Sequence, residues 1–407
     1  MSNNNFNEND NSDEERIQLM GINEQNQLSV DIGENSHTAH LERHKPRIYW
    51  IDCLRVFASY IVVFQHTSFI NFPRRYGDDN WKPLFFYNSF ARHCVPIFIM
   101  ISGLLFLSPK KVVSIKTFFS KYIYRIFISL VFWTLYYNII NEYVVNVHRA
   151  NYHFTLEEIG RCLYRVVLGS NSGHLWYLYF CIGLYMLTPL YKCITEKREI
   201  AWYVAGICVV FSQAMPSIIL FINTYILNIN LVSELIKKLY FEMIGSNSAY
   251  YLLGYLLNTE EIENKLIIRL FYVMGIVGQI LTIILRFDAC YRNNREVSNF
   301  GNRNDLNVAM ITVGTFMFFK HGLSDWINRI MNNNRFIRKL VLTTSECSFG
   351  IYLVHMAVYD ILLTFFHFQP ITFNPTFWMP IYCTIIYCIT AFTVYLLRLI
   401  PFFRKVT

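Results

Sequence analysis

The strongest constraint on the fold is a series of long apolar segments that begins after residue 46. Most of them approach the roughly 20 residues that an α-helix needs to cross a bilayer. Charged residues make up only 16% of the chain, below the roughly 25% of ordinary soluble domains. The sequence therefore predicts an all-α, polytopic membrane protein with about ten transmembrane helices. The predicted helices fall within residues 48–71, 90–107, 122–141, 174–194, 200–222, 243–258, 266–286, 305–321, 347–367 and 376–400.

The two ends of the chain and the distribution of charge predict the topology. Residues 1–46 are rich in Asn, Glu, Asp and Gln and nearly free of aromatic residues, which predicts a disordered polar tail before a membrane domain of residues 47–407. An even number of crossings places both termini on one side, and the loops on that side carry more Lys and Arg than the others. The positive-inside rule then predicts cytoplasmic termini in a multi-pass protein of the cell membrane.

Charge and cysteine patterns argue against two other classes of function. The net charge of +8 is spread over loops and helix ends instead of forming one basic face, so no nucleic-acid partner is predicted. The ten cysteines show no CxxC pair and no His/Cys ligand spacing, so no metal site is predicted.

The first predicted helix differs from a simple membrane anchor because it carries Asp52, Arg55, Ser59 and His66. At about 100° per residue, these four side chains lie within about 60° of one another around the helix axis. A charged side chain at the centre of a membrane helix costs roughly 2.5 to 3.5 kcal/mol on insertion scales, so such residues normally face a protein interior or a water-filled cavity. This helix is therefore predicted to line a site.

Arg55 and His66 together fit an extended substrate that carries phosphate. They are eleven residues apart, which is about 16 Å and about three helical turns, so they point the same way at different depths. Arginine binds phosphate oxygens through two hydrogen bonds, and histidine accepts a proton near neutral pH. A nucleotide thioester threaded into the membrane would meet both. Two structural alternatives stay open: a buried ion pair between Asp52 and Arg55, and a hydrogen-bonded core role for His66.

Four motifs, in order along the chain, resemble one family. The first is R-x10-H within IDCLRVFASYIVVFQH at residues 51–66. The others are VPIFIMISGLLFL at 95–107, HLWYLYFCIGLYMLTPLY at 174–191 and SFGIYLVH at 348–355. Together they resemble the acyltransferase-3 family of integral-membrane O-acyltransferases, which modify surface polysaccharides and related acceptors.

The resemblance implies transfer from cytoplasmic acyl-CoA, with acetyl-CoA as the expected donor substrate and no bound cofactor. His66 matches the family's catalytic histidine, and Arg55 matches the arginine that contacts the donor. One motif departs from the family, which has Arg-x-x-Arg at the start of the third helix, whereas this chain has Tyr122 and Arg125, with Lys121 beside them. Lys121 and Arg125 are four residues apart and are predicted to bind donor phosphate from one helix face, or to be ordinary flanking charges.

Further candidates lie in the remaining motifs. His174 and Trp176 begin a helix at the outer surface, where a sugar can stack on the indole, although interfacial aromatic residues also serve as anchors. Ser102 is assigned to close helix packing or to a supporting role at the site, and no activating base lies near it in sequence. Tyr352 and His355 either face the cavity or form hydrogen bonds between helices.

The predicted function is that of a membrane O-acyltransferase that moves an acyl group, with acetyl as the first candidate, from acyl-CoA to a hydroxyl of a cell-surface glycan or lipid-linked sugar. In this interpretation Asp52 supports the site. The alternative is an exporter of polysaccharide or lipid-linked sugar, whose polar intramembrane residues would line a translocation path. A third alternative is a membrane scaffold that acts through the polar tail.

Overall fold

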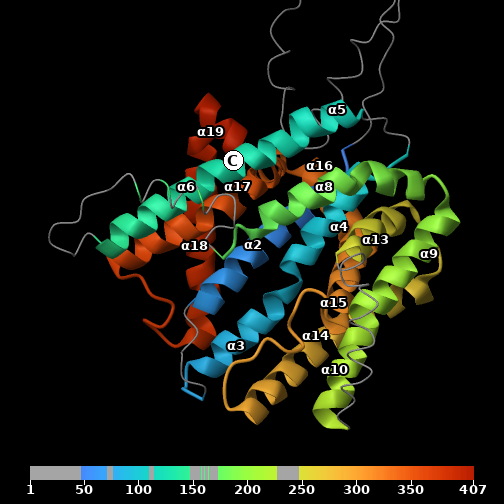
Figure 1. Ribbon diagram of the computed structural model, residues 1–407, viewed down its shortest axis with the longest axis horizontal. Helices are drawn as coiled ribbons and strands as arrows, with labels where there is room; N and C mark the ends of the chain where they lie inside the picture. The colour runs from blue at the N-terminus through green and yellow to red at the C-terminus, as the bar shows by residue number, and fades with distance from the viewer. Residues whose placement is uncertain are drawn as a thin grey trace, which may run out of the picture.

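The computed structural model describes residues 47–70, 77–109, 114–146, 173–226 and 247–407, together with residues 157, 160 and 164. Every regular element in these residues is a helix (Figure 1). The predicted polar tail, residues 1–46, lies outside the described residues. The helices are α2 Tyr49–Ile70, α3 Trp81–Phe90, η1 Ala91–His93, α4 Cys94–Phe106, α5 Ile115–Thr117, η2 Phe118–Ile123, α6 Tyr124–Asn146, α8 Trp176–Thr195, α9 Arg198–Val209, η3 Val210–Ala214, α10 Met215–Tyr225, α13 Ser248–Thr259, α14 Lys265–Asn293, α15 Leu306–Met317, η4 Phe318–Leu323, α16 Ser324–Asn333, α17 Arg335–Phe366, α18 Pro375–Leu397 and α19 Pro401–Val406.

The predicted all-α membrane fold is confirmed. In the part of the chain that the structure describes, 8 helical segments are long and apolar enough to cross a membrane. The central helix α2 and the 12-residue α13 are not among them. Each predicted segment contains a helix, but the total of about ten crossings stays a prediction.

Local sequence signals set several helix boundaries. Asn264, Asn334 and Asn374 precede α14, α17 and α18, and each side chain accepts a hydrogen bond from a backbone N–H in the first turn. This satisfies donors that have no partner inside the helix. At the other end, α14 and α17 stop at Asn294 and His367, which adopt the left-handed conformation with φ of 46° and 51°.

The outward face of α14 is a broad apolar surface. Leu270, Val273, Ile276, Ile280 and Ile284 recur at helical spacing, and each side chain is at least half exposed. A water-soluble protein rarely exposes so many adjacent aliphatic residues. This face therefore fits contact with lipid acyl chains.

Helix α2 occupies the middle of the bundle. It packs against α3, α4, α16, α17 and α18, and Figure 1 shows it enclosed by these later segments. Leu54, Ala58 and Val63 on α2 are fully buried. A helix surrounded by protein can carry polar residues that would be costly against lipid.

Contacts along α2 give the directions of its neighbours. Asp52, near the start of α2, bonds to Ser345, and His66, near its end, lies against His355, so α2 and α17 run parallel. The start of α8 reaches His66 through His174, so α8 runs in the opposite direction. These directions agree with the predicted alternation of crossings.

The two ends of the described membrane domain lie at the same end of the bundle, here called the Arg47 end. Arg47 bonds to Asp52 at 3.0 Å and lies 3.8 Å from Glu346. Close by, Arg125 donates a hydrogen bond to an oxygen of Thr407 at 3.1 Å. The shared side agrees with the predicted topology, and its assignment to the cytoplasm stays a prediction.

Two glycines bring α4 and α13 into backbone contact. A Cβ at Gly103 on α4 would lie 2.7 Å from the carbonyl carbon of Tyr251, and one at Gly254 on α13 would lie 2.6 Å from that of Met100. Both distances are too short for real Cβ atoms. Small residues allow this approach in membrane helices, where packing replaces the hydrophobic effect between helices. This contact fixes α4 in position beside the site.

Candidate active site

The polar residues of α2 have different surroundings. Asp52 accepts hydrogen bonds from Arg47 at 3.0 and 3.2 Å and from Ser345 at 2.7 Å. Arg47 is therefore the ion-pair partner of Asp52, where the structural alternative had expected Arg55. Ser59 lies 2.8 Å from the hydroxyl of Tyr387 on α18, so it joins two helices. Ser59 consequently lies away from the cavity that Arg55 lines.

Arg55 lies in a cavity, here called the α2 cavity, between α2, α4, α6, α8 and α17. The cavity holds about 930 Å³ of space unoccupied by atoms, including its open mouth. Among the residues that were predicted to form the site, Arg55, Ser102, Arg125 and Tyr352 line it. The full lining is Arg55, Phe98, Ile101, Ser102, Leu105, Phe106, Arg125, Ile126, Tyr177, Cys181, Tyr185, Ser345, Glu346, Ser348, Phe349 and Tyr352.

The guanidinium of Arg55 is available inside the α2 cavity. It forms no hydrogen bond and no salt bridge with another described residue. Arg125 reaches the same cavity from α6 but donates hydrogen bonds to oxygens of Arg404 at 3.4 Å and Thr407 at 3.1 Å. Glu346 is the cavity's carboxylate, and its closest cation is Arg47. The guanidinium of Arg55 can therefore donate two hydrogen bonds to the oxygens of one phosphate group.

Three histidines from separate helices converge beyond this cavity. His66, His174 and His355 have ring centroids 5.1 Å apart for the 66–355 pair, 5.3 Å for the 174–355 pair and 6.2 Å for the 66–174 pair. We call them the histidine cluster. His174 is 4% exposed and His355 is fully buried, whereas His66 is partly exposed. His66 is thus the member of the cluster that a substrate can reach.

Hydrogen bonds fix the tautomer of His355. Its Nδ1 lies 2.7 Å from the carbonyl oxygen of Tyr352, so Nδ1 carries the proton in the neutral ring and Nε2 is an acceptor. Nε2 of His355 and Nε2 of His174 are both buried without a hydrogen-bond partner. In the described residues, no group of three His, Cys, Asp or Glu is placed to hold a metal ion. The cluster therefore places two buried ring nitrogens that lack hydrogen-bond partners beside His66.

Tyr352 connects the α2 cavity to the histidine cluster. Its side chain lines the cavity, and its hydroxyl donates a hydrogen bond to the carbonyl oxygen of His174. Its ring centroid lies 5.9 Å from that of His174 and 6.2 Å from that of His355. The cavity that holds Arg55 and the cluster that holds His66 therefore share a wall formed by Tyr352.

Three predicted residues belong neither to the lining of the α2 cavity nor to the histidine cluster: Asp52, described above, Lys121 and Trp176. Lys121 falls in the π-helical segment η2 and does not line the α2 cavity. Its ammonium lies 5.5 Å from the ring centroid of Tyr122. Trp176 lies beside His174 in sequence, but the guanidinium carbon of Arg303 covers its ring at 4.1 Å.

Sequence reasoning missed two residues at the site. Tyr137 on α6 packs its ring 4.8 Å from that of His174, and its hydroxyl donates to the carbonyl oxygen of Leu353 at 2.6 Å. No motif distinguishes Tyr137 from the many other tyrosines of the chain. Glu346 had a usable signal, a carboxylate in an apolar helix, but the predicted segment began one residue later.

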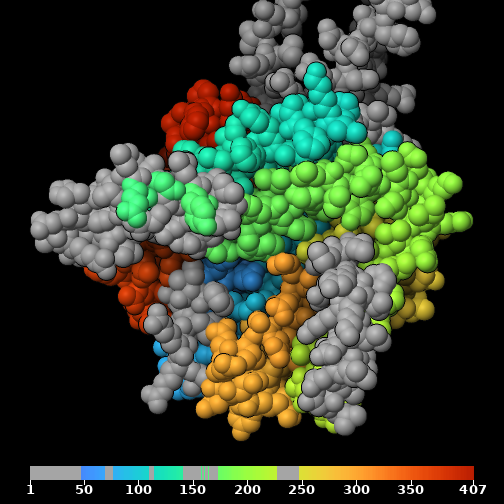
Figure 2. Space-filling model, in the orientation of Figure 1, coloured from blue at the N-terminus to red at the C-terminus, as the bar shows by residue number. Residues whose placement is uncertain are grey.

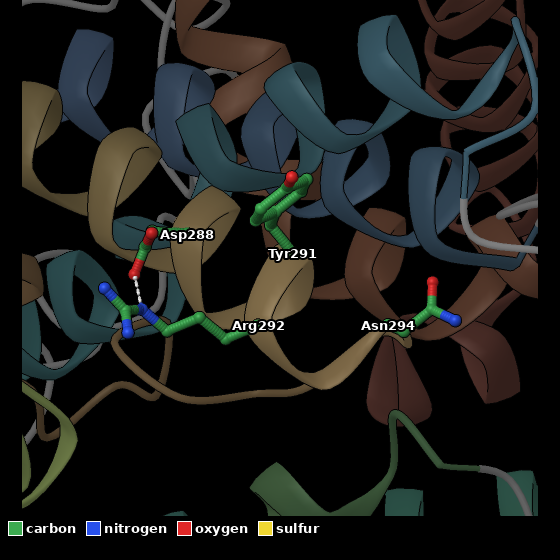
Figure 3. Close-up of a pocket in the computed structure, with 4 residues that line it drawn as sticks. All are labelled: Asp288, Tyr291, Arg292 and Asn294. Atoms are coloured by element: carbon green, nitrogen blue, oxygen red, sulfur yellow. Dashed lines mark hydrogen bonds and ion pairs between the residues drawn. The ribbon is translucent and has the colours of Figure 1, made fainter.

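A second pocket lies at the surface, far along the chain from these residues. It is lined by Asp288, Tyr291, Arg292 and Asn294 at the end of α14. Figure 3 shows the pair of Asp288 and Arg292, whose Oδ2–Nε distance is 2.7 Å, one turn apart. Tyr225 also donates a hydrogen bond to Asp288 at 2.7 Å. These groups already satisfy one another, so this pocket shows no chemistry comparable to the α2 cavity.

Comparison with known families agrees with this geometry. The family model described as an acyltransferase domain matches residues 48–397, which is most of the chain. The chain belongs to the acyltransferase-3 family. No curated protein and no solved structure matches it. Together with the apolar helices, family membership makes the protein a multi-pass membrane acyltransferase.

Proposed function

We propose that this acyltransferase moves a short acyl group, with acetyl as the first candidate, from cytoplasmic acyl-CoA to a hydroxyl of a cell-surface glycan or lipid-linked sugar in the cell membrane. The observation that carries the proposal is the available guanidinium of Arg55 in a cavity that shares the Tyr352 wall with the histidine cluster. The α2 cavity suits phosphate, and the histidine cluster on the other side of Tyr352 suits proton transfer.

The α2 cavity supplies what the donor requires. Arg55 binds phosphate oxygens of the nucleotide, and Arg125 adds positive charge on the α6 side. Phe98, Ile101 and Leu105 give α4 an apolar wall against which the pantetheine arm packs. The roughly 16 Å between the levels of Arg55 and His66 lets an extended thioester place its carbonyl near the cluster.

The histidine cluster supplies the base. Neutral His66 takes the proton from the acceptor hydroxyl as the hydroxyl oxygen attacks the thioester carbonyl carbon. The new C–O bond forms, the C–S bond breaks, and the proton passes from His66 to the departing CoA thiolate. The buried rings of His174 and His355 pack beside His66, with centroids 6.2 and 5.1 Å from its own, and hold it in position.

A labelled-donor assay tests this function. Purified protein in lipid vesicles receives [14C]acetyl-CoA and a mixture of cell-surface glycans, with [14C]succinyl-CoA as a parallel donor. We expect label to appear on the glycan as an alkali-labile ester. Glycan that crosses the vesicle membrane without label would instead identify an exporter, and the acyl-transfer proposal would be wrong.

Arg55→Gln is expected to raise the KM for acyl-CoA by about 10- to 100-fold, because it removes charge-assisted hydrogen bonds to phosphate. The kcat at saturating donor should change much less, because Arg55 lies a long way from the reacting carbonyl. Arg55→Lys keeps the charge but loses the planar guanidinium group. Its KM for acyl-CoA should therefore lie between those of wild type and Arg55→Gln. Initial rates over a range of donor concentrations give the KM and kcat of each variant.

The control is Arg269→Gln, which removes an exposed cation on α14. An unchanged KM in Arg55→Gln would contradict the donor assignment.

A further inference from the structure

Three arginines at the His66 end of the bundle have no carboxylate partner. Arg92, Arg286 and Arg303 come from η1, α14 and the segment after α14. No carboxylate of a described residue lies within the 4.0 Å that defines a salt bridge to any of them. Arg286 is fully buried, and Arg92 and Arg303 are partly exposed. Buried cations are normally paired, so three unpaired arginines near one site require an explanation.

Arg92 and Arg286 share a single neutral acceptor. Both donate to Oδ1 of Asn88, and Arg286 also donates to the hydroxyl of Ser89 and lies 4.7 Å over the ring of Phe85. The Nε atoms of both arginines are buried and have no hydrogen-bond partner. One amide oxygen therefore serves two guanidinium groups, and donor capacity is left over.

The nearby acids do not neutralise this charge by contact. Glu296 and Asp305 interact with Arg92 and Arg286 only at longer range. Asp305 accepts a hydrogen bond from the backbone N–H of Asn302 at 2.7 Å, and burial raises its pKa to about 6. Burial also raises the pKa of Glu296.

Arg92 and Arg303 both lie at the end of the bundle where α2 ends and α8 begins. Arg92 donates to Oδ1 of Asn88, and the amide of Asn88 donates at 3.3 Å to the carbonyl oxygen of Gln65, the residue before His66. Arg303 covers the ring of Trp176, two residues beyond His174, and its Nε is likewise buried without a partner. Figure 2 shows a recess on this face, with the blue of α2 on its floor and the green of α8 and the orange segment after α14 at its rim.

We propose that Arg92 and Arg303 form an acceptor-side site for an oxyanion, a carboxylate or phosphate carried by the sugar that is acylated. Arg286 acts through Asn88 and Ser89 as a positioning residue. This inference rests on the proposed function and specifies its acceptor as anionic. The site is separate from the donor's phosphate site, because Arg55 lies eleven residues before His66 on α2, about 16 Å away along the helix axis.

The position of Trp176 gives the site a second component. An indole face packs against a sugar ring, and the arginine above it contributes charge at the same place. Arg303 can move off Trp176 toward an oxyanion without breaking a salt bridge, because it has none within the described residues. Trp176 and Arg303 thus fit the ring and the charge of one anionic sugar.

Direct binding tests the site without any acyl donor. The probes are methyl β-D-glucuronide, methyl β-D-glucoside 6-phosphate and neutral methyl β-D-glucoside, titrated against detergent-purified full-length protein by ligand-observed NMR. We expect at least one anionic probe to bind about tenfold more tightly than the neutral glucoside. The carboxylate and phosphate probes decide which oxyanion the site prefers.

Variants locate the site. Arg92→Gln and Arg303→Gln should each reduce the preference for the anionic probe by about tenfold, and the Lys variants should retain part of it. Arg295→Gln, an exposed cation in the same segment as Arg303, is the matched control and should bind as wild type. Arg55→Gln should also keep the preference, which separates this site from the donor cavity. Each variant's thermal unfolding midpoint shows that it is folded.

Two results would overturn the inference: equal binding of anionic and neutral probes by wild type, or an unchanged preference in both Arg92→Gln and Arg303→Gln. A failure of the proposed function would look different, because labelled acyl groups would not be transferred although the anionic probe still binds.

Discussion

His66→Asn is expected to lower acyl transfer by about 10²- to 10⁴-fold, the range that a general base contributes. Asparagine keeps a polar side chain of similar reach but cannot accept the proton from the acceptor hydroxyl at neutral pH. Because Arg55 still holds the donor, the KM for acyl-CoA should stay near its wild-type value. Initial rates with labelled acetyl-CoA in lipid vesicles measure both quantities.

His367→Asn is the matched control for this variant. His367 is exposed at the end of α17, where φ is 51°, a conformation that asparagine tolerates well. It removes an imidazole away from the cluster and should leave activity unchanged. If His66→Asn retained wild-type kcat while His367→Asn behaved as expected, His66 would not be the base.

Gly103→Ala is expected to destabilise the protein strongly. The new Cβ would lie 2.7 Å from the carbonyl carbon of Tyr251, which belongs to a helix backbone and cannot rotate away as a side chain does. Overpacking costs about 1–3 kcal/mol of folding free energy where side chains can adjust. Because the obstacle here is backbone, the loss for Gly103→Ala should be at or above the upper end of that range. Since α4 lines the cavity through the adjacent Ser102, activity should fall as well. Thermal unfolding in detergent and the yield of folded protein measure the effect.

Gly206→Ala provides the comparison. Gly206 lies inside α9, and a Cβ there would meet nothing within 4 Å. Alanine favours the helix over glycine by about 1 kcal/mol, so this variant should be as stable as wild type or slightly more so. Equal stability of the two variants would show that the α4–α13 contact is looser than described.

The sequence by itself determined the fold class, the family and the approximate place of each apolar helix, although α17 begins at Arg335 and not near residue 347. These follow from local properties: the length of an apolar segment, its composition and the spacing of a few residues within one helix. Placing Arg55 in a cavity was also possible from sequence, because a charged residue in a membrane helix must face protein or water. The same reasoning failed for Ser59, which instead bonds to Tyr387 on α18.

Tertiary structure decided which residues meet. His66, His174 and His355 were separate candidates in sequence, and only the packing of α2, α8 and α17 brings their rings within 6.2 Å of one another. Lys121 shows the converse, because it was predicted to share a site with Arg125 and only Arg125 lines the α2 cavity.

The sequence could not show that the arginines at the His66 end lack carboxylate partners, because an unpaired charge is recognised only when its surroundings are known. Arg92 and Arg286 share the amide oxygen of Asn88 only because α3 and α14 pack together. Hydropathy and helical periodicity describe each helix separately, whereas the site depends on contacts between helices that are distant in sequence. For that physical reason the chain's family could be inferred from sequence, and the α2 cavity, the histidine cluster and the arrangement of the arginines required the folded structure.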